Sequence, residues 1–120
     1  MKKLIIKIKP ISVNKVWQGK RFRTPEYRDW IDKALWLMKK QEKVGGRIYL
    51  KITFYIKYPL KSDLDNYLKP SIDLIVRKGW IEDDRFIFKL DTQKIEVKKE
   101  EDERIEYEIK NIERSEINKQ

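Results

Sequence analysis

Residues 47–58 alternate apolar and polar side chains more regularly than any other stretch of the chain. The apolar set on one side consists of Ile48, Leu50, Ile52, Phe54 and Ile56. A period of two is typical of a β-strand with one buried face, because successive side chains of a strand point to opposite sides. Gly45-Gly46 precedes this stretch and Pro59 follows it, which limits the strand at both ends. The chain is therefore expected to contain a β-sheet with one covered face.

Three further stretches show strand-like alternation, namely residues 3–9, 86–97 and 105–109. In the second of them the apolar positions change parity across Thr92-Gln93, which predicts a β-bulge or a bend at that point. The charged run 98–103 predicts a hairpin turn between the last two strands. The sequence thus indicates about four strands.

A first helix is predicted to begin at Thr24-Pro25, because threonine is a good N-cap and proline suits the first helical position. Apolar residues then recur at helical spacing, so this helix is expected to reach about Lys43. Trp30 and Trp36 within it are interpreted as packing residues.

A second helix is predicted over residues 64–78, where apolar residues are spaced by three and four and Gly79 supplies the end. Pro70 falls beyond its first turn, where proline lacks an amide and clashes with the carbonyl four residues earlier. We therefore expect a tight or kinked turn over 65–69, with regular helix afterwards.

These elements predict a single domain of the α/β (α+β) class, with a small mixed sheet of about four strands and two main helices. A chain of 120 residues can bury one core of this kind. The expected boundaries are 1–112 for the domain and 113–120 for a polar C-terminal tail. No apolar run approaches the ~20 residues of a membrane span, and signal-peptide architecture is absent. A cytoplasmic protein without a membrane partner is expected.

The composition excludes several kinds of chemistry. The chain has no cysteine and no histidine, which removes disulfides, thiolate zinc sites and triads built on histidine. It carries a net charge of +9, and the positive excess lies in residues 1–60, whereas residues 61–120 are slightly acidic. A basic half of this kind favours a polyanionic partner.

Against that positive background, two short segments carry closely spaced acidic residues around one lysine. The first is the run Asp63-Leu64-Asp65-Asn66-Tyr67-Leu68-Lys69 with Asp73 after it, and the second is Glu82-Asp83-Asp84. Asp65, Lys69 and Asp73 are four residues apart, so they are expected to project along one side of a helix. Carboxylate clusters in a basic protein make chemical sense if a divalent cation sits between them and a phosphate.

Phosphodiester hydrolysis needs an activated water, neutralisation of the charge on phosphorus and help for the leaving oxygen, and Mg²⁺ or Mn²⁺ held by carboxylates supplies these. Asp63 and Asp65 are candidate ligands, and Asp83-Asp84 is the candidate source of a third carboxylate. Lys69 would place a positive charge near the scissile phosphate. The alternative is that these acids are helix caps and solvated turn residues.

The segment between residues 10 and 28 mixes aromatic residues with cations, a composition that suits nucleic acid. The candidate DNA-binding residues in it are Asn14, Lys15, Trp17, Lys20, Arg21, Arg23 and Arg28. The alternative interpretation is that Trp17 and Phe22 cap the core while the cations are solvated.

The combined pattern resembles the RusA family of Holliday-junction resolvases. Its motif reads D-x-D-N-x-x-K-x-x-x-D, then a glycine, then D-D before a strand with a further lysine. The matching residues here are Asp63, Asp65, Asn66, Lys69, Asp73, Gly79, Asp83, Asp84 and Lys94. The early Pro10-x-Ser12-x-Asn14-x-x-Trp17 is similar to the family's N-terminal segment, so the resemblance covers roughly residues 4–110.

The resemblance implies a homodimer of small RusA-like α/β subunits that resolves four-way DNA junctions in recombination and repair by paired symmetric nicks, using Mg²⁺ or Mn²⁺. It implies that Asp63, Asp65 and Asp84 are the metal-binding catalytic acids and that Lys69 is the essential lysine. The supporting residues would be Asn66, Asp73, Asp83 and Lys94, with Asn66 supporting the turn by hydrogen bonding. For Asp73 the alternative is an ion pair with Lys69 or Arg77.

One departure from the family pattern concerns phosphate binding. Family members often carry strongly basic residues just before the first aspartate, whereas here Lys61-Ser62 precedes Asp63. Arg21, Arg23 and Arg28 are alternative sources of that positive charge.

Two other functions remain open from the sequence. One is a non-catalytic, basic nucleic-acid-binding module, which would bind DNA without metal and tolerate Asp63→Asn. The other is a less selective structure-specific nuclease that acts on flaps or single strands. Competition between junction, fork and linear duplex at one salt concentration separates these possibilities, because nonspecific affinity depends on salt.

Overall fold

The computed structural model describes residues 2–13, 17–18 and 22–112. Its elements are β1 (Lys2–Ile6), β2 (Trp17–Gln18), β3 (Phe22–Arg23), α1 (Pro25–Leu37), β4 (Ile48–Ile56), η2 (Pro59–Lys61), α2 (Asp65–Lys78), η3 (Asp84–Phe86), β5 (Ile87–Glu96), η4 (Glu100–Asp102) and β6 (Arg104–Asn111), where η denotes a 3-10 turn. The predicted tail, residues 113–120, lies outside the described residues. Among the helices of the described part, none is long and apolar enough to cross a membrane.

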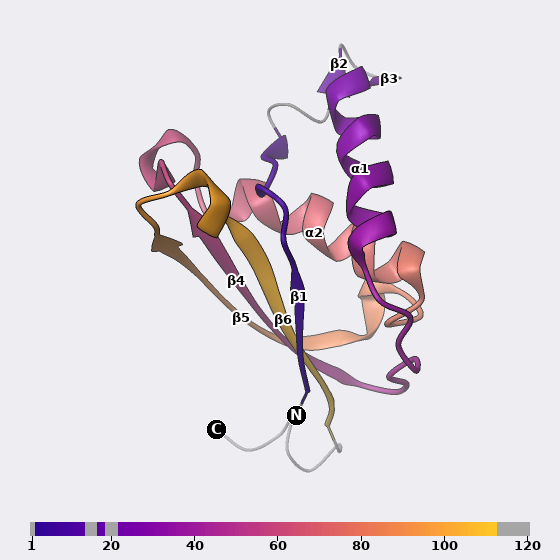
Figure 1. The fold of residues 1–120 in the computed structure, drawn as a ribbon. Helices are drawn as coiled ribbons and strands as arrows, with labels where there is room; N and C mark the ends of the chain where they lie inside the picture. Colours follow the sequence, from indigo (N-terminus) through magenta and orange to yellow (C-terminus); the bar gives the residue numbers. More distant parts are fainter. Residues whose placement is uncertain (1, 14–16, 19–21, 113–120) are drawn as a thin grey trace.

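The main sheet has four strands in the order β1-β6-β4-β5 (Figure 1). β4 pairs antiparallel with β6 and parallel with β5, and β1 pairs antiparallel with β6. Both helices lie on one side of this sheet. A mixed four-stranded sheet with two helices on one face confirms the predicted fold class.

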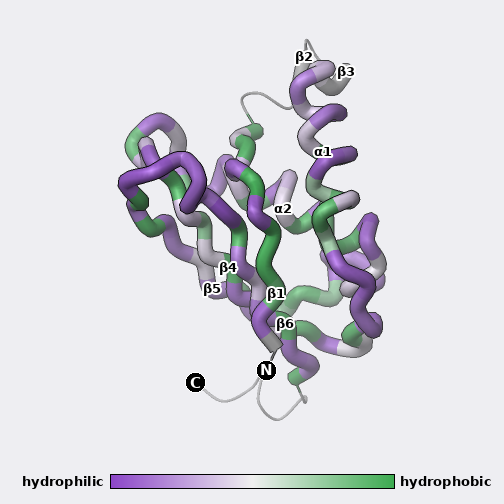
Figure 2. The backbone as a smooth tube through the Cα atoms, viewed as in Figure 1, coloured by the Kyte–Doolittle hydropathy of each residue, from purple (hydrophilic) through white to green (hydrophobic). Residues whose placement is uncertain are grey.

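The core lies between the sheet and the helices. The five inward residues predicted for β4 are all buried, with exposed fractions of 4% or less. β1 and β6 contribute Ile6, Ile105 and Tyr107 to the same layer, and the helices add Tyr27 and Leu74. Figure 2 agrees with this division. In it the middle of β1 is mostly hydrophobic, whereas most turns of α1 are hydrophilic.

The connection between β5 and β6 differs from the prediction. Residues 97–103 do not form a hairpin, because β4 lies between β5 and β6 and the chain must cross its end. The Val97 amide donates to the Ile56 carbonyl at 3.0 Å, and the buried Glu103 carboxylate accepts from the Lys57 amide at 3.0 Å. β4 takes the interior position because its inward face is entirely apolar, whereas the more polar β5 is left at the edge.

The predicted bulge at Thr92-Gln93 is also wrong. The register of β5 on β4 is regular from Lys89 to Glu96, and its irregularity lies between the pairs made by Ile87 and Lys89. Parallel partners share a face, so the Thr92 position faces the helices like Ile52, its partner on β4. The apolar residues later in β5 therefore lie on the other face of an edge strand, which the apolar pattern alone does not reveal.

α1 begins as predicted and ends earlier. Thr24 Oγ1 accepts from the Tyr27 amide at 3.1 Å, but the helix stops at Leu37 rather than near Lys43. Met38 is extended and buried, and the next carbonyl, that of Lys39, accepts the indole hydrogen of Trp80 at 2.9 Å. The helix therefore ends at Leu37 because the residues that follow it make tertiary contacts.

The two tryptophans of α1 have different environments. Trp30 is half-buried, stacks beside Tyr27 with ring centroids 6.2 Å apart and donates to the Lys9 carbonyl at 2.7 Å, so its predicted packing role is confirmed. Trp36 is 83% exposed, so the same prediction for Trp36 is wrong. The apolar stripe of α1 is narrow, and Trp36 lies outside it.

α2 is continuous from Asp65 to Lys78 with Pro70 inside it, which corrects the predicted irregular turn over 65–69. Pro70 is buried, so its packing against the core offsets the missing amide bond. The tight turn lies just before the helix, where backbone bonds join the Asn66 amide to the Asp63 carbonyl and the Tyr67 amide to the Leu64 carbonyl. The predicted end at Gly79 is confirmed by its left-handed φ of 81°.

A buried carboxylate stabilises the face of the sheet that the helices leave open. Glu106 is 8% exposed and lies 2.7 Å from Arg104 Nε and 3.5 Å from Lys3 Nζ. Burial opposes its ionisation, but the ion pairs with Arg104 and Lys3 outweigh burial and hold the pKa of Glu106 below its ordinary value of 4.5. Glu106 therefore stabilises the fold in its charged form.

Replacing this carboxylate by an amide gives a pH-dependent loss of stability. We expect Glu106→Gln to lower the free energy of unfolding by about 1–3 kcal/mol at pH 7, as for other bonds to buried charged groups. Because the folded-state pKa is depressed, the difference from the parent should persist above pH 4.5 and shrink as the pH falls below that value. Urea unfolding between pH 3 and pH 8 measures it.

Glu108→Gln is the matched control on the same strand. Glu108 is paired with Lys51 at 3.6 Å, but its side chain is 27% exposed and Lys51 is 41% exposed. The control should therefore lose less than about 1 kcal/mol. A Glu106 variant whose deficit stayed constant down to pH 3 would contradict the ion-pair explanation.

Candidate active site

The segment that carries the first aspartate is fixed by a lysine from the edge strand. Lys94 Nζ donates to the Pro59 carbonyl at 2.8 Å and to the Ser62 carbonyl at 3.1 Å. Asp63 follows directly. Lys94, which the sequence placed among the supporting residues, thus holds the backbone segment that leads to Asp63.

Asp63 and Asp65 flank the start of α2, and both are exposed. Asp65 is the first residue of the helix, where a negative charge faces the positive end of the helix dipole. The Asp63 carbonyl accepts from the Asn66 amide at 3.1 Å, so Asn66 supports the turn through its backbone. The carboxylates of Asp63 and Asp65 are therefore both exposed to solvent at the N-terminal end of α2.

The continuous helix places the next polar residues on the same side as Asp65. Lys69 and Asp73 follow at intervals of four, which keeps all three on one stripe of α2. The alternative for Asp73 is not realised, because among the ion pairs of the described residues none within 4.0 Å joins Asp73 to Lys69 or Arg77. Asp73 is half-buried and lies close enough to Asp84 to act on it electrostatically.

Asp83 and Asp84 lie at the entry to β5 and interact with each other. Asp83 caps η3, and its Oδ1 accepts from the Arg85 amide at 3.2 Å. A hydrogen bond with the Asp84 carboxyl, together with the Arg85 amide, lowers the pKa of Asp83. The same hydrogen bond, partial desolvation and the charge of Asp83 raise the pKa of Asp84. The two carboxyl groups therefore lie in direct contact and perturb each other's ionisation in opposite directions.

The charges on α2 also act on Asp84. Lys69 lowers the pKa of Asp84 and Asp73 raises it, although both effects are smaller than that of Asp83. The structure therefore brings Asp84 close to Lys69 and Asp73. These three residues come from two elements, α2 and η3, which pack against each other.

The acidic side chains do not form a closed metal site. In the part of the chain that the structure describes, no three of them converge closely enough to hold a metal ion. The donor set nevertheless fits a hard divalent cation, because it offers only oxygen atoms and its carboxylates are accessible. The contact between the Asp83 and Asp84 carboxyl groups marks a place where a cation would relieve charge repulsion.

The candidate DNA-binding residues are only partly within the structure. Asn14, Lys15, Lys20 and Arg21 lie outside the described residues. Trp17 pairs with Arg23 in a small two-stranded sheet of β2 and β3. Arg28 is exposed on α1 and lines a cavity of about 420 Å³ with Asp32 and Arg77. DNA binding by these residues stays a prediction.

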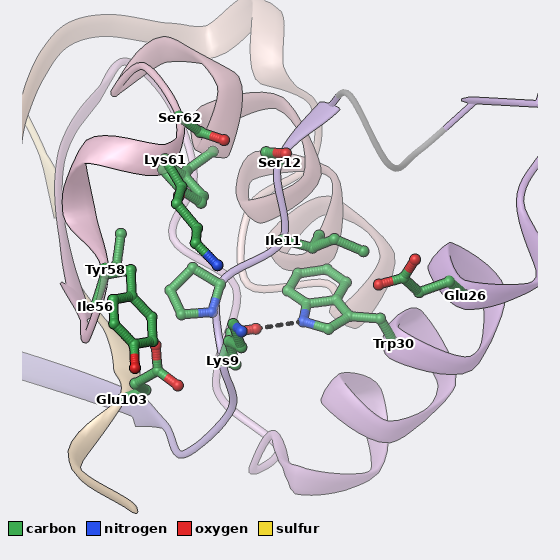
Figure 3. Close-up of a pocket in the computed structure, with 12 residues that line it drawn as sticks. Lys9, Ile11, Ser12, Glu26, Trp30, Ile56, Tyr58, Lys61, Ser62 and Glu103 are labelled. Carbon is green, nitrogen blue, oxygen red and sulfur yellow. Dashed lines mark hydrogen bonds between the residues drawn. The ribbon is translucent and has the colours of Figure 1, made fainter. Parts of the chain in front are cut away.

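Sequence reasoning missed the loop 58–62 and the pocket beside it. Tyr58 is 49% exposed and Leu60 is 96% exposed, and Lys57 and Lys61 lie 5.3 and 4.9 Å from the centroid of the Tyr58 ring. A pocket of about 530 Å³ opens between this loop and the segment 9–12, with Tyr58 and Trp30 on opposite sides (Figure 3). The only sequence signal was an aromatic and an apolar residue next to the acidic motif.

Residues 8–110 match the family model described as Endodeoxyribonuclease RusA. The chain belongs to the RusA family. A relative from Aquifex aeolicus (strain VF5), the crossover junction endodeoxyribonuclease RusA, is 35% identical over 86 residues, which cover 68% of each chain. The predicted family is thus confirmed, and the candidate site residues from Asp63 to Asp84 lie within the matched region.

The role of Lys94 is testable through the loop that it holds. Lys94→Met removes two bonds from a charged donor, each worth about 1.5–3 kcal/mol, and frees the carbonyls of Pro59 and Ser62. We expect the cleavage rate to fall about 10-fold and the amide hydrogens of residues 60–64 to exchange faster. Hydrogen exchange and single-turnover cleavage of junction DNA measure the two effects.

Lys89→Met is the matched control for Lys94→Met. Lys89 lies on the same strand, is exposed and lies over the Tyr49 ring on the other face of the sheet. Both readouts should stay within about 2-fold of the parent. Unchanged exchange in Lys94→Met would show that the loop does not depend on this lysine.

Proposed function

We propose that this chain is a metal-dependent endonuclease that resolves four-way DNA junctions by paired symmetric nicks during recombination and repair. The observation that carries the proposal is the proximity of Asp84 to Lys69 and Asp73, on the helix that Asp65 begins, in a chain of the RusA family. These acids and the lysine come from separate segments of the chain and lie near one another. Phosphodiester hydrolysis explains this arrangement better than a role of the acids as helix caps.

The proposed roles follow from the chemistry of each group. Asp63, Asp65 and Asp84 would hold Mg²⁺ or Mn²⁺, which when bound activates water and neutralises charge at phosphorus. Lys69 donates to a non-bridging oxygen of the scissile phosphate and thereby stabilises the charge that develops there. Asp73 and the Asp83 carboxylate keep the surrounding field negative, and Asp83 also caps the turn that carries Asp84.

The proposed substrate and assembly follow from charge and symmetry. A net charge of +9 supports binding to a polyanion, with the candidate residues of 10–28 as phosphate contacts. Symmetric nicking of two strands needs two active sites, whereas the described residues of one 14.7 kDa chain offer a single arrangement of these acids with Lys69. A homodimer with a two-fold axis satisfies this requirement. We assign residues 1–112 to the endonuclease domain.

The test uses a labelled synthetic four-way junction. Purified protein with Mg²⁺ or Mn²⁺ should introduce nicks at symmetry-related positions in two strands, and EDTA should abolish nicking without abolishing the gel shift. Unlabelled junction, fork and linear duplex are then compared as competitors at one salt concentration. Binding without nicking under either metal would favour a non-catalytic module, and equal cutting of flaps and junctions would favour a less selective nuclease.

A further inference from the structure

The loop 58–62 places an apolar side chain directly beside the acidic motif. Leu60 is 96% exposed, and Asp63 follows three residues later. Single exposed apolar residues are common on protein surfaces, so exposure alone assigns no role to Leu60. Its support, its neighbours and its charge environment distinguish it.

The loop is held in a defined conformation on both sides of Leu60. The Lys94 ammonium binds the carbonyls that precede and follow the tip, those of Pro59 and Ser62. The Lys61 amide donates to the Tyr58 carbonyl at 3.3 Å, which closes the turn. The Leu60 side chain is thus carried on a supported projection, and little ordering is needed when it contacts a ligand.

The projection lies between two different surfaces. On the side of β1, the pocket of about 530 Å³ is lined by Tyr58, Lys61 and Ser62 of the loop and by Trp30 of α1 (Figure 3). On its other side the loop leads to Asp63 and to Asp65 at the start of α2. A DNA strand whose phosphate lies at Asp63 and Asp65 would therefore contact Leu60 next and the pocket beyond it.

The charge around the projection favours nucleic acid over another copy of the chain. Lys57 and Lys61 flank the Tyr58 ring, and Lys94 lies beneath the loop. Two copies of so basic a surface would repel each other, whereas phosphates are attracted to it.

The pocket volume falls within the range of about 300–1,000 Å³ that is usual for small-ligand sites.

We propose that the loop 58–62 opens the branch point of the junction. Leu60 inserts between base pairs at the crossover, and the base that it displaces enters the pocket between Tyr58 and Trp30. Apolar side chains that enter DNA unstack base steps in this way, and aromatic rings offer a surface for the freed base. This inference rests on the proposed junction-resolving function and names the element that recognises the branch point.

The test is fluorescence of 2-aminopurine placed at the branch point of a four-way junction, without divalent metal. The 2-aminopurine is placed opposite the displaced base, outside the aromatic pocket, and becomes brighter when its pairing and stacking are lost, so saturating parent protein should raise the signal at least about twofold. Leu60→Ala should lose more than half of that rise and about 5-fold or more of the preference for junction over duplex. Trp36→Ala, which removes another exposed apolar side chain, is the matched control and should behave like the parent.

The outcomes separate this inference from the proposed function. If the parent cuts junctions but Leu60→Ala keeps the full fluorescence rise and junction preference, the loop does not open the branch point and the inference is overturned while the function stands. If the parent neither prefers nor cuts junctions, the proposed function fails as well. If Leu60→Ala changes the molar mass measured by light scattering, Leu60 lies between copies of the chain, which also overturns the inference.

Discussion

Asp65→Asn is expected to reduce Mg²⁺-dependent cleavage of four-way junctions by at least about 10²-fold, the scale of losing one charge-stabilising group in an active site. The substitution keeps the shape of the side chain and removes the charge that would hold the cation. Because Asp65 is exposed at the first position of α2, the fold should survive with a loss of about 1 kcal/mol or less. Gel shifts without metal should show junction binding equal to that of the parent or stronger, since a negative charge has been removed.

The control for Asp65→Asn is Asp29→Asn. Asp29 is exposed on α1, a different helix from the one that carries Asp65, and its replacement changes the net charge by the same amount. Its cleavage rate should stay within about 2-fold of the parent. Calorimetric titration with Mn²⁺ adds a readout that does not depend on cleavage, and Asp65→Asn should bind the ion more weakly. Cleavage by Asp65→Asn at the rate of the parent would remove Asp65 from the proposed metal site.

The fold class could be predicted from the sequence because its main signals are local. The alternation in β4, the Thr24 cap of α1 and the left-handed Gly79 after α2 depend on neighbouring residues only. Strand order is not local. The insertion of β4 between β5 and β6 depends on which strand has the most apolar inward face, and the early end of α1 depends on a bond from Trp80.

The candidate site divides in the same way. The spacing of Asp65, Lys69 and Asp73 predicted a common stripe, and the continuous helix provides it. The sequence did not predict the bonds from Lys94 to the loop carbonyls or the exposure of Leu60, because both depend on how separate elements pack together. A spacing rule identifies residues on one element, whereas the contacts between elements need the structure.

Trp80→Ala is expected to destabilise the protein by about 3–5 kcal/mol, the usual cost of removing a large buried aromatic side chain. Trp80 is 1% exposed, its ring meets Tyr107 edge to face at 5.7 Å, and its indole nitrogen donates to the Lys39 carbonyl. The substitution would leave a cavity beneath the sheet and free the carbonyl that follows the end of α1. Urea unfolding followed by far-UV circular dichroism, at one protein concentration, measures the loss.

Trp36→Ala is the matched comparison, because it makes the same chemical change at a residue that is 83% exposed. It should alter the free energy of unfolding by no more than about 0.5 kcal/mol. If Trp80→Ala does not fold, Trp80→Phe keeps the ring contact, loses the bond to Lys39 and should be intermediate in stability. Equal losses at the two tryptophans would mean that Trp36 is buried in solution, and the exposed face of α1 would then be part of the contact between subunits.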